Sequence, residues 1–416
     1  MDSFSDFLIL VSFFLEVAVL FYLELKAWGT LYTPLNFLML PFALNLLITL
    51  LAVSTYDFVP IYYSCLMLWS VGLLLFAVPS ITLGCLLQKS KVAVSFTISE
   101  ERFPKVMLYA GYLIALLLIY RLYSVTLSSA EPFGSEDFGV EYCGTGLWGH
   151  LRLVTLPILI MAIYYVDKRN RILWPLILLI LFINFMYQVK GWVIIPCIAG
   201  LAMRLYSGKL KLNMRFFLYV IGGALLVFLI TYVIIPILGN DGIVTLELLE
   251  FVLGHFFHYL TSGILGLSID AVRGFPDSGS FEMVLAPFIN IGNQLIGSDE
   301  LLSPVNPYYY NSGITLTNVR TLFGTLYIYS NYAQFAVYTL VLSCIMYGLR
   351  LVSLKFNSVF LYVVYFFECS LLFMGWFEFY FFHLAAIEIP IVTLLLMLVY
   401  KVLQTPAVKP AIPVSR

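Results

Sequence analysis

Long runs of apolar residues, separated by short polar stretches, dominate the chain. Eleven such runs lie near 7–25, 36–56, 61–87, 105–127, 151–166, 172–187, 191–206, 216–238, 326–349, 358–376 and 384–403. A helix of about 20 apolar residues crosses the hydrocarbon core of a bilayer with all its backbone hydrogen bonds made internally. The pattern therefore predicts an all-α polytopic membrane protein with about 11 transmembrane helices (10–12), forming a single transmembrane domain over residues 1–416.

Basic residues in the short connections orient these helices. They gather at 89–105, 167–171 ("DKRNR"), 204–215, 350–355 and 401–416, always on the same side of the predicted bundle. Short cytoplasmic loops are enriched in Lys and Arg. We therefore predict that the N-terminus lies outside and the C-terminus lies in the cytoplasm.

The composition agrees with a membrane protein and excludes other classes. Hydrophobic residues make up 62% of the 416 and charged residues 11%, whereas soluble proteins average about half and a quarter. The net charge is −1 and no basic block is present, so we expect no nucleic-acid partner. The six cysteines are scattered and imply no disulfide framework.

Two predicted outer segments are long. Residues 128–149 are acidic and glycine-rich, which indicates a loop. Residues 239–325 form a far longer outer segment, which must carry structure of its own. Its first part, 245–274, predicts a helix of about 28 residues that contains three glycines.

Polar residues recur along 245–274 at helical spacing. They are His255, His258, Ser262, Gly266, Asp270 and Arg273. Residues three and four apart share one helix face, so we predict a polar seam that faces a water-filled cavity; the alternative is a seam that faces bulk water. Two histidines without further ligands do not make a metal site, so we predict no metal and a hydrogen-bonding or acid–base role for the histidines.

Five basic residues fall on the outer side, where the charge rule predicts few. They are Arg121, Arg152, Lys190, Arg273 and Arg320. A cation buried in a membrane costs at least about 3 kcal/mol, so it normally has a partner, and Arg and Lys both bind phosphate. We predict that the five converge on a diphosphate; alternatively, each pairs with an outer carboxylate or snorkels to the interface. Gly191, next to Lys190, would leave room for a headgroup.

The stretch "SPVNPYYYNSG" (303–313) combines amides with three tyrosines. Sugars pack their C–H faces on aromatic rings and hydrogen bond to amides. The candidate sugar-binding residues are Asn306, Tyr308, Tyr309, Tyr310, Asn318 and His255. The alternative is a belt of aromatic residues at the membrane interface.

Three stretches carry a resemblance to a known family: "LYTPLNFLMLPFALNLL", "YQVKGWVIIPCIAGL" and "TNVRTLFGTLYIYSNYAQFAVYTLVLSCIMYGL". With the pattern of spans and the single large outer segment, they resemble the Wzy-type polymerases of bacterial O-antigen and capsule repeat units. The resemblance implies a GT-C-like O-antigen polymerase/ligase bundle in the bacterial inner membrane, with 239–325 in the periplasm.

Such an enzyme is a metal-independent membrane glycosyltransferase without a cofactor. It moves a growing glycan from undecaprenyl diphosphate onto the sugar of a new lipid-linked repeat unit. Its expected partners are this lipid-linked oligosaccharide, membrane lipids and a co-polymerase that regulates chain length.

The resemblance also suggests roles for the candidate residues. A basic residue followed by glycine begins a mid-chain span of the family, and Lys190–Gly191 matches it. We expect Lys190, Arg152 and Arg121 to bind the diphosphate, and Arg273 and Arg320 to stabilise its developing charge. His258 is the expected base or orienting group, with Asp270 as its alternative.

Other functions remain open. An O-antigen ligase would share the fold and the carrier, and a lipid-linked oligosaccharide flippase or transporter would also be apolar with buried charges. Four acids in or near the spans bear on the transporter: Glu16, Glu368, Glu378 and Glu388. They would line an ion path in a transporter, and otherwise they make helix–helix contacts or, for Glu378 and Glu388, lie at interfacial helix ends.

Overall fold

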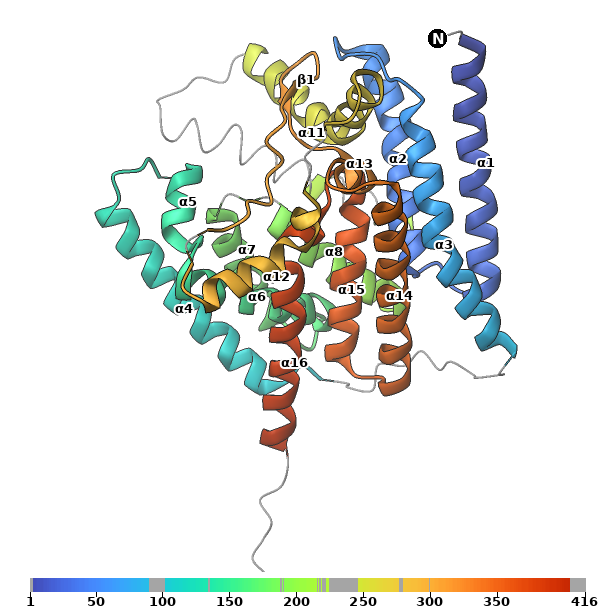
Figure 1. The fold of residues 1–416 in the computed structure, drawn as a ribbon. Helices are drawn as coiled ribbons and strands as arrows, with labels where there is room; N and C mark the ends of the chain where they lie inside the picture. Colours follow the sequence, from blue (N-terminus) through green and yellow to red (C-terminus); the bar gives the residue numbers. More distant parts are fainter. Residues whose placement is uncertain are drawn as a thin grey trace, which may run out of the picture.

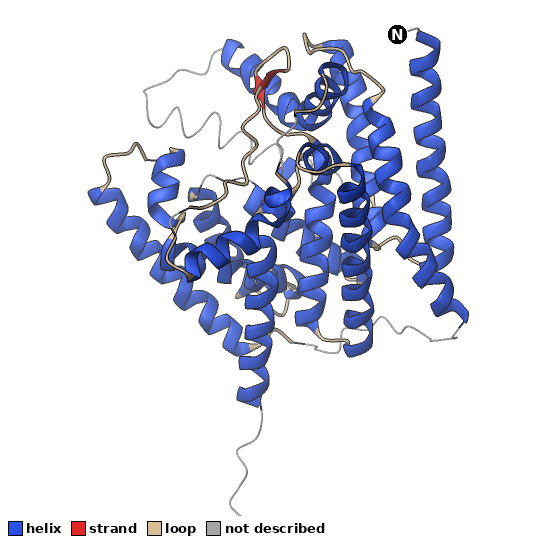
Figure 2. Ribbon diagram, in the orientation of Figure 1, coloured by secondary structure: helices blue, strands red, loops and turns tan. Residues whose placement is uncertain are grey.

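The computed structural model describes most of the chain, which is mainly helical there, with connecting loops and one two-stranded hairpin (Figures 1 and 2). The described residues are 3–89, 102–133, 135–187, 189, 191–214, 216, 218, 222–223, 246–276, 280–298 and 300–404. The predicted class, an all-α polytopic membrane protein, is confirmed.

The α-helices are α1 (Ser3–Trp28), α2 (Pro34–Thr55), α3 (Cys65–Lys89), α4 (Lys105–Ser128), α5 (Glu136–Cys143), α6 (Gly146–Tyr165), α7 (Leu173–Met186), α8 (Gly191–Tyr206), α11 (Leu246–Arg273), α12 (Ala286–Leu295), α13 (Thr321–Ile328), α14 (Tyr332–Phe356), α15 (Val359–Phe373) and α16 (Ala385–Gln404). Short 3₁₀ helices are η2 (Phe281–Leu285), η3 (Met374–Trp376) and η4 (Tyr380–Phe382). Two strands, β1 (Tyr310–Asn311) and β2 (Leu316–Thr317), pair antiparallel with Tyr310 opposite Thr317.

Nine helices in the described part of the chain are long and apolar enough to cross a membrane. They are α1, α2, α3, α4, α6, α14, α15 and α16, together with Val252–Arg273 of α11. The shorter apolar helices α7 and α8 correspond to the sixth and seventh predicted runs. The eighth predicted run, 216–238, lies largely outside the described residues. The ninth begins later than predicted, because α13 is a separate helix before α14.

The helices α1 to α4, and again α14 to α16, alternate in direction between two ends of the bundle (Figure 1). The upper end holds the start of α1 and the connections 129–145 and 374–384, and α16 finishes at the lower end. This alternation matches the order of outer and inner connections predicted from the basic loops. The start of α1 and the finish of α16 therefore lie at opposite ends.

We call the described residues between 246 and 331 the cap: α11, the β-hairpin and α13 lie at the upper end of the bundle, and α12 lies lower, at the height of the start of α16 (Figure 1). The helix α11 is a single helix of 28 residues, as predicted, and it packs against α2 and α3. Asn45 of α2 donates its side-chain amide to the carbonyl of Leu260 at 2.7 Å. The backbone N–H of Tyr62, which precedes α3, donates to the hydroxyl of Ser268 at 2.6 Å. These bonds seat α11 on the bundle.

The helix α15 lies in the core and is buried on nearly every side. A helix that is apolar all round is stable only when it is surrounded, and α15 packs against α2, α6, α8, α14 and α16. The outer helices differ: α1 and α16 expose large apolar side chains such as Phe4, Leu395 and Val402. Exposed apolar faces of this kind are those that lipid covers in a membrane protein.

Two local predictions were wrong. The segment 128–149 contains α5, which Ser135 caps by accepting a hydrogen bond from the N–H of Phe138 at 3.1 Å. Arg350, assigned to a basic loop, is buried inside α14, where it donates to the carbonyl of Tyr32 at 2.6 Å and the hydroxyl of Tyr365 at 3.0 Å. Both acceptors bind Nη1, and the guanidinium also lies 4.9 Å from the ring centre of Trp28, so they offset part of the cost of burying its charge.

Glycine at position 263 allows α11 to approach the bundle closely. A Cβ there would lie 2.4 Å from the carbonyl oxygen of Trp376, which belongs to the backbone and cannot rotate away. Gly254, on the same helix, is a natural comparison, because a Cβ there would meet only Ile314 at 3.9 Å.

We expect Gly263→Ala to destabilise the protein by about 1–3 kcal/mol, since overpacking forces a backbone shift. Gly254→Ala should be neutral or slightly stabilising, because alanine is the better helix former. Thermal unfolding of the purified protein in detergent, followed by tryptophan fluorescence, measures both. Equal unfolding midpoints for the two variants would contradict the packing described here.

Candidate functional site

The polar seam of α11 exists, but from His258 to Asp270 it faces protein and not a water-filled cavity or bulk water, whereas Arg273 at its end is exposed. Its residues pack against the extended segment 306–320 of the cap, through contacts that run from His258 to Asp270. Ser262 and Asp270 are buried. The predicted helix is confirmed, and the predicted cavity is wrong because the tyrosine-rich segment covers the seam.

The strongest contact of the seam is a buried ion pair. Arg320 donates from Nε to a carboxylate oxygen of Asp270 at 2.6 Å, and both side chains are fully buried. The rest of the guanidinium donates to backbone carbonyls, from Nη2 to Tyr308 at 2.9 Å and from Nη1 to Val319 at 3.1 Å. With its donors committed to the chain itself, Arg320 acts as a positioning residue of the cap and does not present its charge to a ligand.

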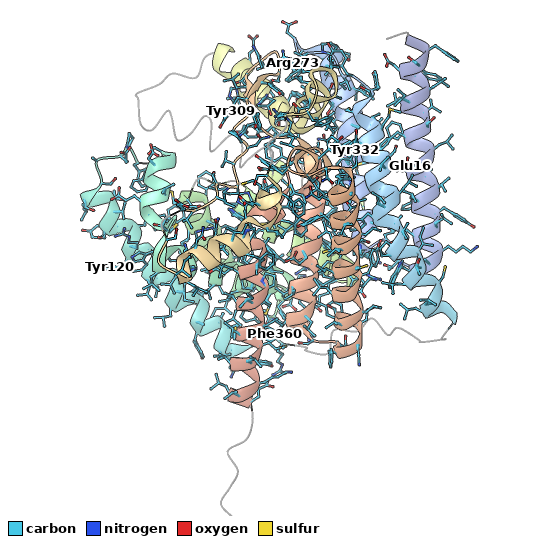
Figure 3. The ribbon with its side chains drawn as sticks, viewed as in Figure 1. Glu16, Tyr120, Arg273, Tyr309, Tyr332 and Phe360 are labelled. Carbon is cyan, nitrogen blue, oxygen red and sulfur yellow. The ribbon has the colours of Figure 1, made fainter. Side chains whose placement is uncertain are left out.

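Tyr310 lies between two arginines. The guanidinium of Arg320 is 4.4 Å from the centre of its ring and that of Arg273 is 5.3 Å away. Burial and the neighbouring carboxylate of Asp270 raise the pKa of the Tyr310 hydroxyl, which keeps it protonated. Arg273 itself is exposed at the upper end, near the exposed Tyr309 (Figure 3). These two side chains form the solvent-facing part of the predicted site.

His258 is buried and ties α11 to the β-hairpin. Its Nδ1 is hydrogen bonded to the hydroxyl of Ser312 at 3.1 Å, and that hydroxyl donates to the carbonyl of Thr315 at 2.8 Å. His255 is half-buried, with its ring centre 6.3 Å from that of His258. A histidine enclosed in this way supports the hairpin and is poorly placed to reach a substrate hydroxyl.

The predicted sugar-binding residues divide by exposure. Asn306 is buried and accepts from the N–H of Tyr308 at 3.0 Å, so it stabilises its own turn and cannot contact a sugar. Asn318 is half-buried and donates to the carbonyl of Asn306 at 3.3 Å. Tyr308 and Tyr310 are half-buried, whereas Tyr309 is 55% exposed. Tyr309 is therefore the aromatic face of this loop that a ligand can reach.

The residue after Arg320 carries backbone strain. Thr321 has a φ of 64°, a region that β-branched residues rarely adopt and that costs on the order of 1–3 kcal/mol. Two contacts hold it there: its N–H donates to the carbonyl of Phe377 at 3.0 Å, and its hydroxyl accepts from Nε1 of Trp69 at 3.0 Å. The strained turn lets Arg320 point at Asp270 while α13 enters the bundle.

A second cationic centre surrounds Arg152 in α6. This arginine is 4% exposed, donates from Nη1 to the amide oxygen of Asn184 at 3.2 Å, and lies 3.9 Å above the ring of Tyr187. No carboxylate among the described residues lies within ion-pair distance of it. Glu388, the acid that influences it, is bound to His150 at 2.6 Å. The charge of Arg152 is therefore buried and, within the described chain, not neutralised.

The start of α8 adjoins this centre. A Cβ on Gly191 would lie 2.7 Å from the hydroxyl of Tyr380, so the tyrosine fills the space that the sequence assigned to a headgroup. Trp192 is buried against the rings of Tyr380 and His383. Lys190, the predicted diphosphate ligand, lies outside the described residues.

Arg121 lies in α4, near α5. It donates to the carbonyl of Glu141 at 3.1 Å and lies 5.7 Å from the ring centre of Trp148. The predicted convergence of the outer cations on one site is thus not observed for the described ones. Arg320 and Arg273 belong to the cap, and Arg152 belongs to the bundle.

That connection joins the two centres. At its start, the carbonyl of Phe377 accepts from Thr321, next to Arg320. Toward its end, Tyr380 and His383 pack on Trp192. Between them lies Glu378, a half-buried acid whose pKa burial raises to about 7. Such a carboxyl exchanges a proton near neutral pH, as a general base or acid must.

From the sequence, Glu378 was predicted to lie on an ion path or at an interfacial helix end, and its place between the two centres was not predicted. The available signal was an isolated carboxylate within "WFEFYFFH" (376–383), an aromatic stretch that offers it few polar partners. Among the residues that the structure describes, no group of three or more His, Cys, Asp or Glu side chains could hold a metal ion.

The fold and these centres define a polytopic all-α membrane protein with a helical cap and buried arginines at the capped end. The chain belongs to a family of unknown function, DUF6337, whose profile matches residues 57–405 and includes both centres and the whole described cap. No curated protein and no solved structure matches the chain.

We expect Asp270→Ala and Arg320→Ala each to destabilise the fold by about 3–5 kcal/mol, because each leaves a buried charge unpaired. The double substitution Asp270→Leu/Arg320→Met should restore most of that loss, since it removes both charges. Urea unfolding in detergent measures the series. Arg273→Ala is the matched control, because Arg273 is exposed and contacts Tyr310, as Arg320 does; it should change the free energy of unfolding by less than about 0.5 kcal/mol. If neither single variant is less stable than this control, the ion pair does not stabilise the fold.

We expect the stability of the protein to fall as pH rises toward neutrality through Glu378. Its pKa is raised from 4.5 to about 7 in the fold, so the fold favours the protonated acid. The stabilisation of the fold by protonated Glu378 is complete below pH 4.5 and is lost as the pH rises through about 7. The free energy of unfolding should fall by at most about 3 kcal/mol over this range. Glu378→Gln should remove this part of the pH dependence in thermal unfolding, whereas Glu300→Gln, at an exposed carboxylate of the cap, should leave it as in the wild type.

Proposed function

We propose that this protein is a metal-independent membrane glycosyltransferase that polymerises lipid-linked oligosaccharide repeat units. The observation that carries the proposal is Arg152, a buried cation that the described chain satisfies only with an amide and an aromatic face. A desolvated charge without a counter-ion is costly. An anionic ligand that supplies oxygens to the guanidinium would remove that cost, and a lipid diphosphate is such a ligand in a membrane.

The position of Arg152 supports a lipid-borne substrate. It lies in the first two turns of α6, in the part of the chain that follows α5, and Lys190 is the residue before α8 in the sequence. From the basic loops at the other end, we assign the capped end to the periplasmic side of a bacterial inner membrane. The bundle would then be a GT-C-like variant of the O-antigen polymerases and ligases, with the cap as its periplasmic segment.

The proposed reaction uses the activation already present in the substrate. The acceptor hydroxyl of a new repeat unit attacks the anomeric carbon of the growing glycan, the bond from that carbon to the diphosphate oxygen breaks, and undecaprenyl diphosphate leaves. Negative charge develops on the leaving diphosphate, where Arg152 and Lys190 would stabilise it. The proton of the acceptor hydroxyl must pass to a base.

We assign the base to Glu378 in place of His258 and Asp270. His258 is engaged with Ser312 and Asp270 with Arg320, so neither is free to approach a hydroxyl. Glu378 is partly exposed, lies on the connection between the two centres, and has a pKa of about 7. Arg273 and Tyr309 on the cap surface would contact the glycan, while Arg320 positions the cap that carries them.

The products distinguish this proposal from its alternatives. A polymerase yields a ladder of glycan lengths on the lipid, an O-antigen ligase transfers a finished glycan once, and a flippase leaves the glycan unchanged. A chain-length co-polymerase is the protein partner that a ladder of defined length would require. The experiment is therefore an assay of the purified protein in liposomes with lipid-linked repeat units, read by gel separation of the glycan.

We expect Arg152→Ala to reduce polymerisation by about 100-fold or more, the loss typical of a group that stabilises developing charge. Arg152→Lys should retain part of the activity, because lysine keeps the charge but not the fork. Glu378→Gln should reduce the rate by about 100-fold without weakening lipid-diphosphate binding.

Lys355→Gln, at an exposed lysine at the opposite end of the bundle, is the control and should retain full activity. All variants are compared at equal folded concentration, established by size-exclusion chromatography. Wild-type activity of folded Arg152→Ala would overturn the proposal.

A further inference from the structure

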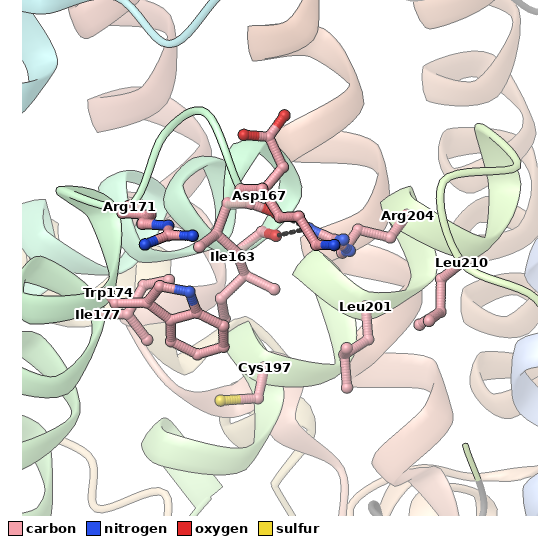
Figure 4. Close-up of a pocket in the computed structure, with 11 residues that line it drawn as sticks. Ile163, Asp167, Arg171, Trp174, Ile177, Cys197, Leu201, Arg204 and Leu210 are labelled. Carbon is pink, nitrogen blue, oxygen red and sulfur yellow. Dashed lines mark hydrogen bonds between the residues drawn. The ribbon is translucent and has the colours of Figure 1, made fainter. Parts of the chain in front are cut away.

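A cavity of about 730 Å³ lies at the lower end of the bundle, between α6, α7 and α8 (Figure 4). It is formed by the C-terminal end of α6, the loop 166–172, the start of α7 and the second half of α8. Arg152 and Val166 are 14 residues apart in the sequence, about 20 Å at the rise of a helix. The cavity is therefore separate from the proposed catalytic site and does not depend on the proposed function.

The walls of this cavity are apolar, and its rim is basic. Ile163, Ile177 and Leu201 line the wall, and the exposed ring of Trp174 stands at the edge. Lys168 and Arg171 belong to the rim, and both are exposed. In Figure 4, Arg171, Trp174 and Ile177 lie on one side of the space and Arg204 and Leu201 on the other. A basic edge on an apolar hollow matches an anionic headgroup attached to a hydrocarbon chain.

Arg204 fixes the two walls relative to each other. It donates from Nη1 to the carbonyls of Ile163 at 2.9 Å and Val166 at 2.5 Å, at the end of α6. The last carbonyls of a helix have no partner within the helix, and a cation there also complements the helix dipole. This contact joins α8 to α6 across the cavity, so the space between them persists without a ligand.

One acid lines the cavity, and its charge is already engaged. The carboxylate of Asp167 accepts from the N–H groups of Arg169 and Asn170, both at 2.8 Å. These backbone bonds hold the pKa of Asp167 below its ordinary value. The cavity lining thus contains one acid and three basic residues, which are Lys168, Arg171 and Arg204. Its net charge is therefore positive.

We propose that the cavity binds an anionic phospholipid, with the phosphate at Lys168 and Arg171 and an acyl chain along Ile163, Ile177 and Leu201. The headgroup would lie where the loop 167–171 meets the bilayer surface, and the chain would enter the hollow between α6 and α8. Such a lipid would bridge the ends of three helices at the place where Arg204 joins α8 to α6. It would stabilise the bundle in proportion to its occupancy.

The test is binding to the purified, delipidated full-length protein, measured by native mass spectrometry and by thermal shift. The probes are phosphatidylglycerol, phosphatidylcholine with the same acyl chains, and inorganic phosphate. We expect phosphatidylglycerol to bind at least about tenfold more tightly than phosphatidylcholine, because only the former has a net negative charge for the basic rim.

Four variants separate headgroup from chain. Lys168→Gln/Arg171→Gln should weaken phosphatidylglycerol binding by about tenfold. Arg169→Gln, in the same loop but outside the cavity lining, should change it by less than about twofold. Leu201→Trp fills the wall and should weaken phosphatidylglycerol while leaving any binding of inorganic phosphate unchanged. Leu201→Ala is its counterpart and should retain the preference for the anionic lipid.

Three results would overturn the proposal. Equal affinity for phosphatidylglycerol and phosphatidylcholine would mean that the basic rim does not recognise the headgroup. Inorganic phosphate binding as tightly as phosphatidylglycerol would identify a soluble anion site. An effect of Arg169→Gln as large as that of the double variant would reduce the rim to general surface charge.

Discussion

The buried ion pair between Asp270 and Arg320 holds the parts of the cap together. Two fully desolvated charges cannot separate without a large cost, and the remaining donors of Arg320 are bonded to the carbonyls of Tyr308 and Val319. One guanidinium therefore joins α11 to the tyrosine-rich loop and to the start of α13. Two neighbouring features accompany this contact. Position 266 must be glycine, because a Cβ there would lie 2.3 Å from the carbonyl oxygen of Val319, and Thr321 adopts a strained backbone conformation.

Two buried arginines at the same end of the molecule thus differ in what they can do. Arg320 has a carboxylate and carbonyls around it, and its charge is used in folding. Arg152 has an amide and a tyrosine ring, and its charge is available to an anion. The difference lies in their partners and not in burial, which is nearly equal for the two. This is why the proposed diphosphate contact falls on α6, and why the connection 374–384, which touches both centres, carries the proposed base.

The basic residues toward the lower end of the bundle also differ in their roles. Arg204 caps α6, Arg350 makes hydrogen bonds in the core, and Lys168 and Arg171 face a hollow at the rim. The positive-inside rule counts all these basic residues alike. The orientation that it predicts depends on the total number of Lys and Arg residues at each end, so a few basic residues with structural roles do not change it.

The sequence by itself determined the class of protein, the alternation of its helices and the 28-residue helix with its polar seam. These follow from local periodicity and from the energy of hydrocarbon transfer, which act on each segment separately. It could not determine what the seam faces, because that depends on a segment some 50 residues later folding back over it. Only the tertiary structure decided that Asp270, His258 and Asn306 are enclosed, that Tyr380 fills the space beside Gly191, and that Glu378 is desolvated. Pairing and desolvation are properties of neighbours in space, and a single chain read along its length does not contain them.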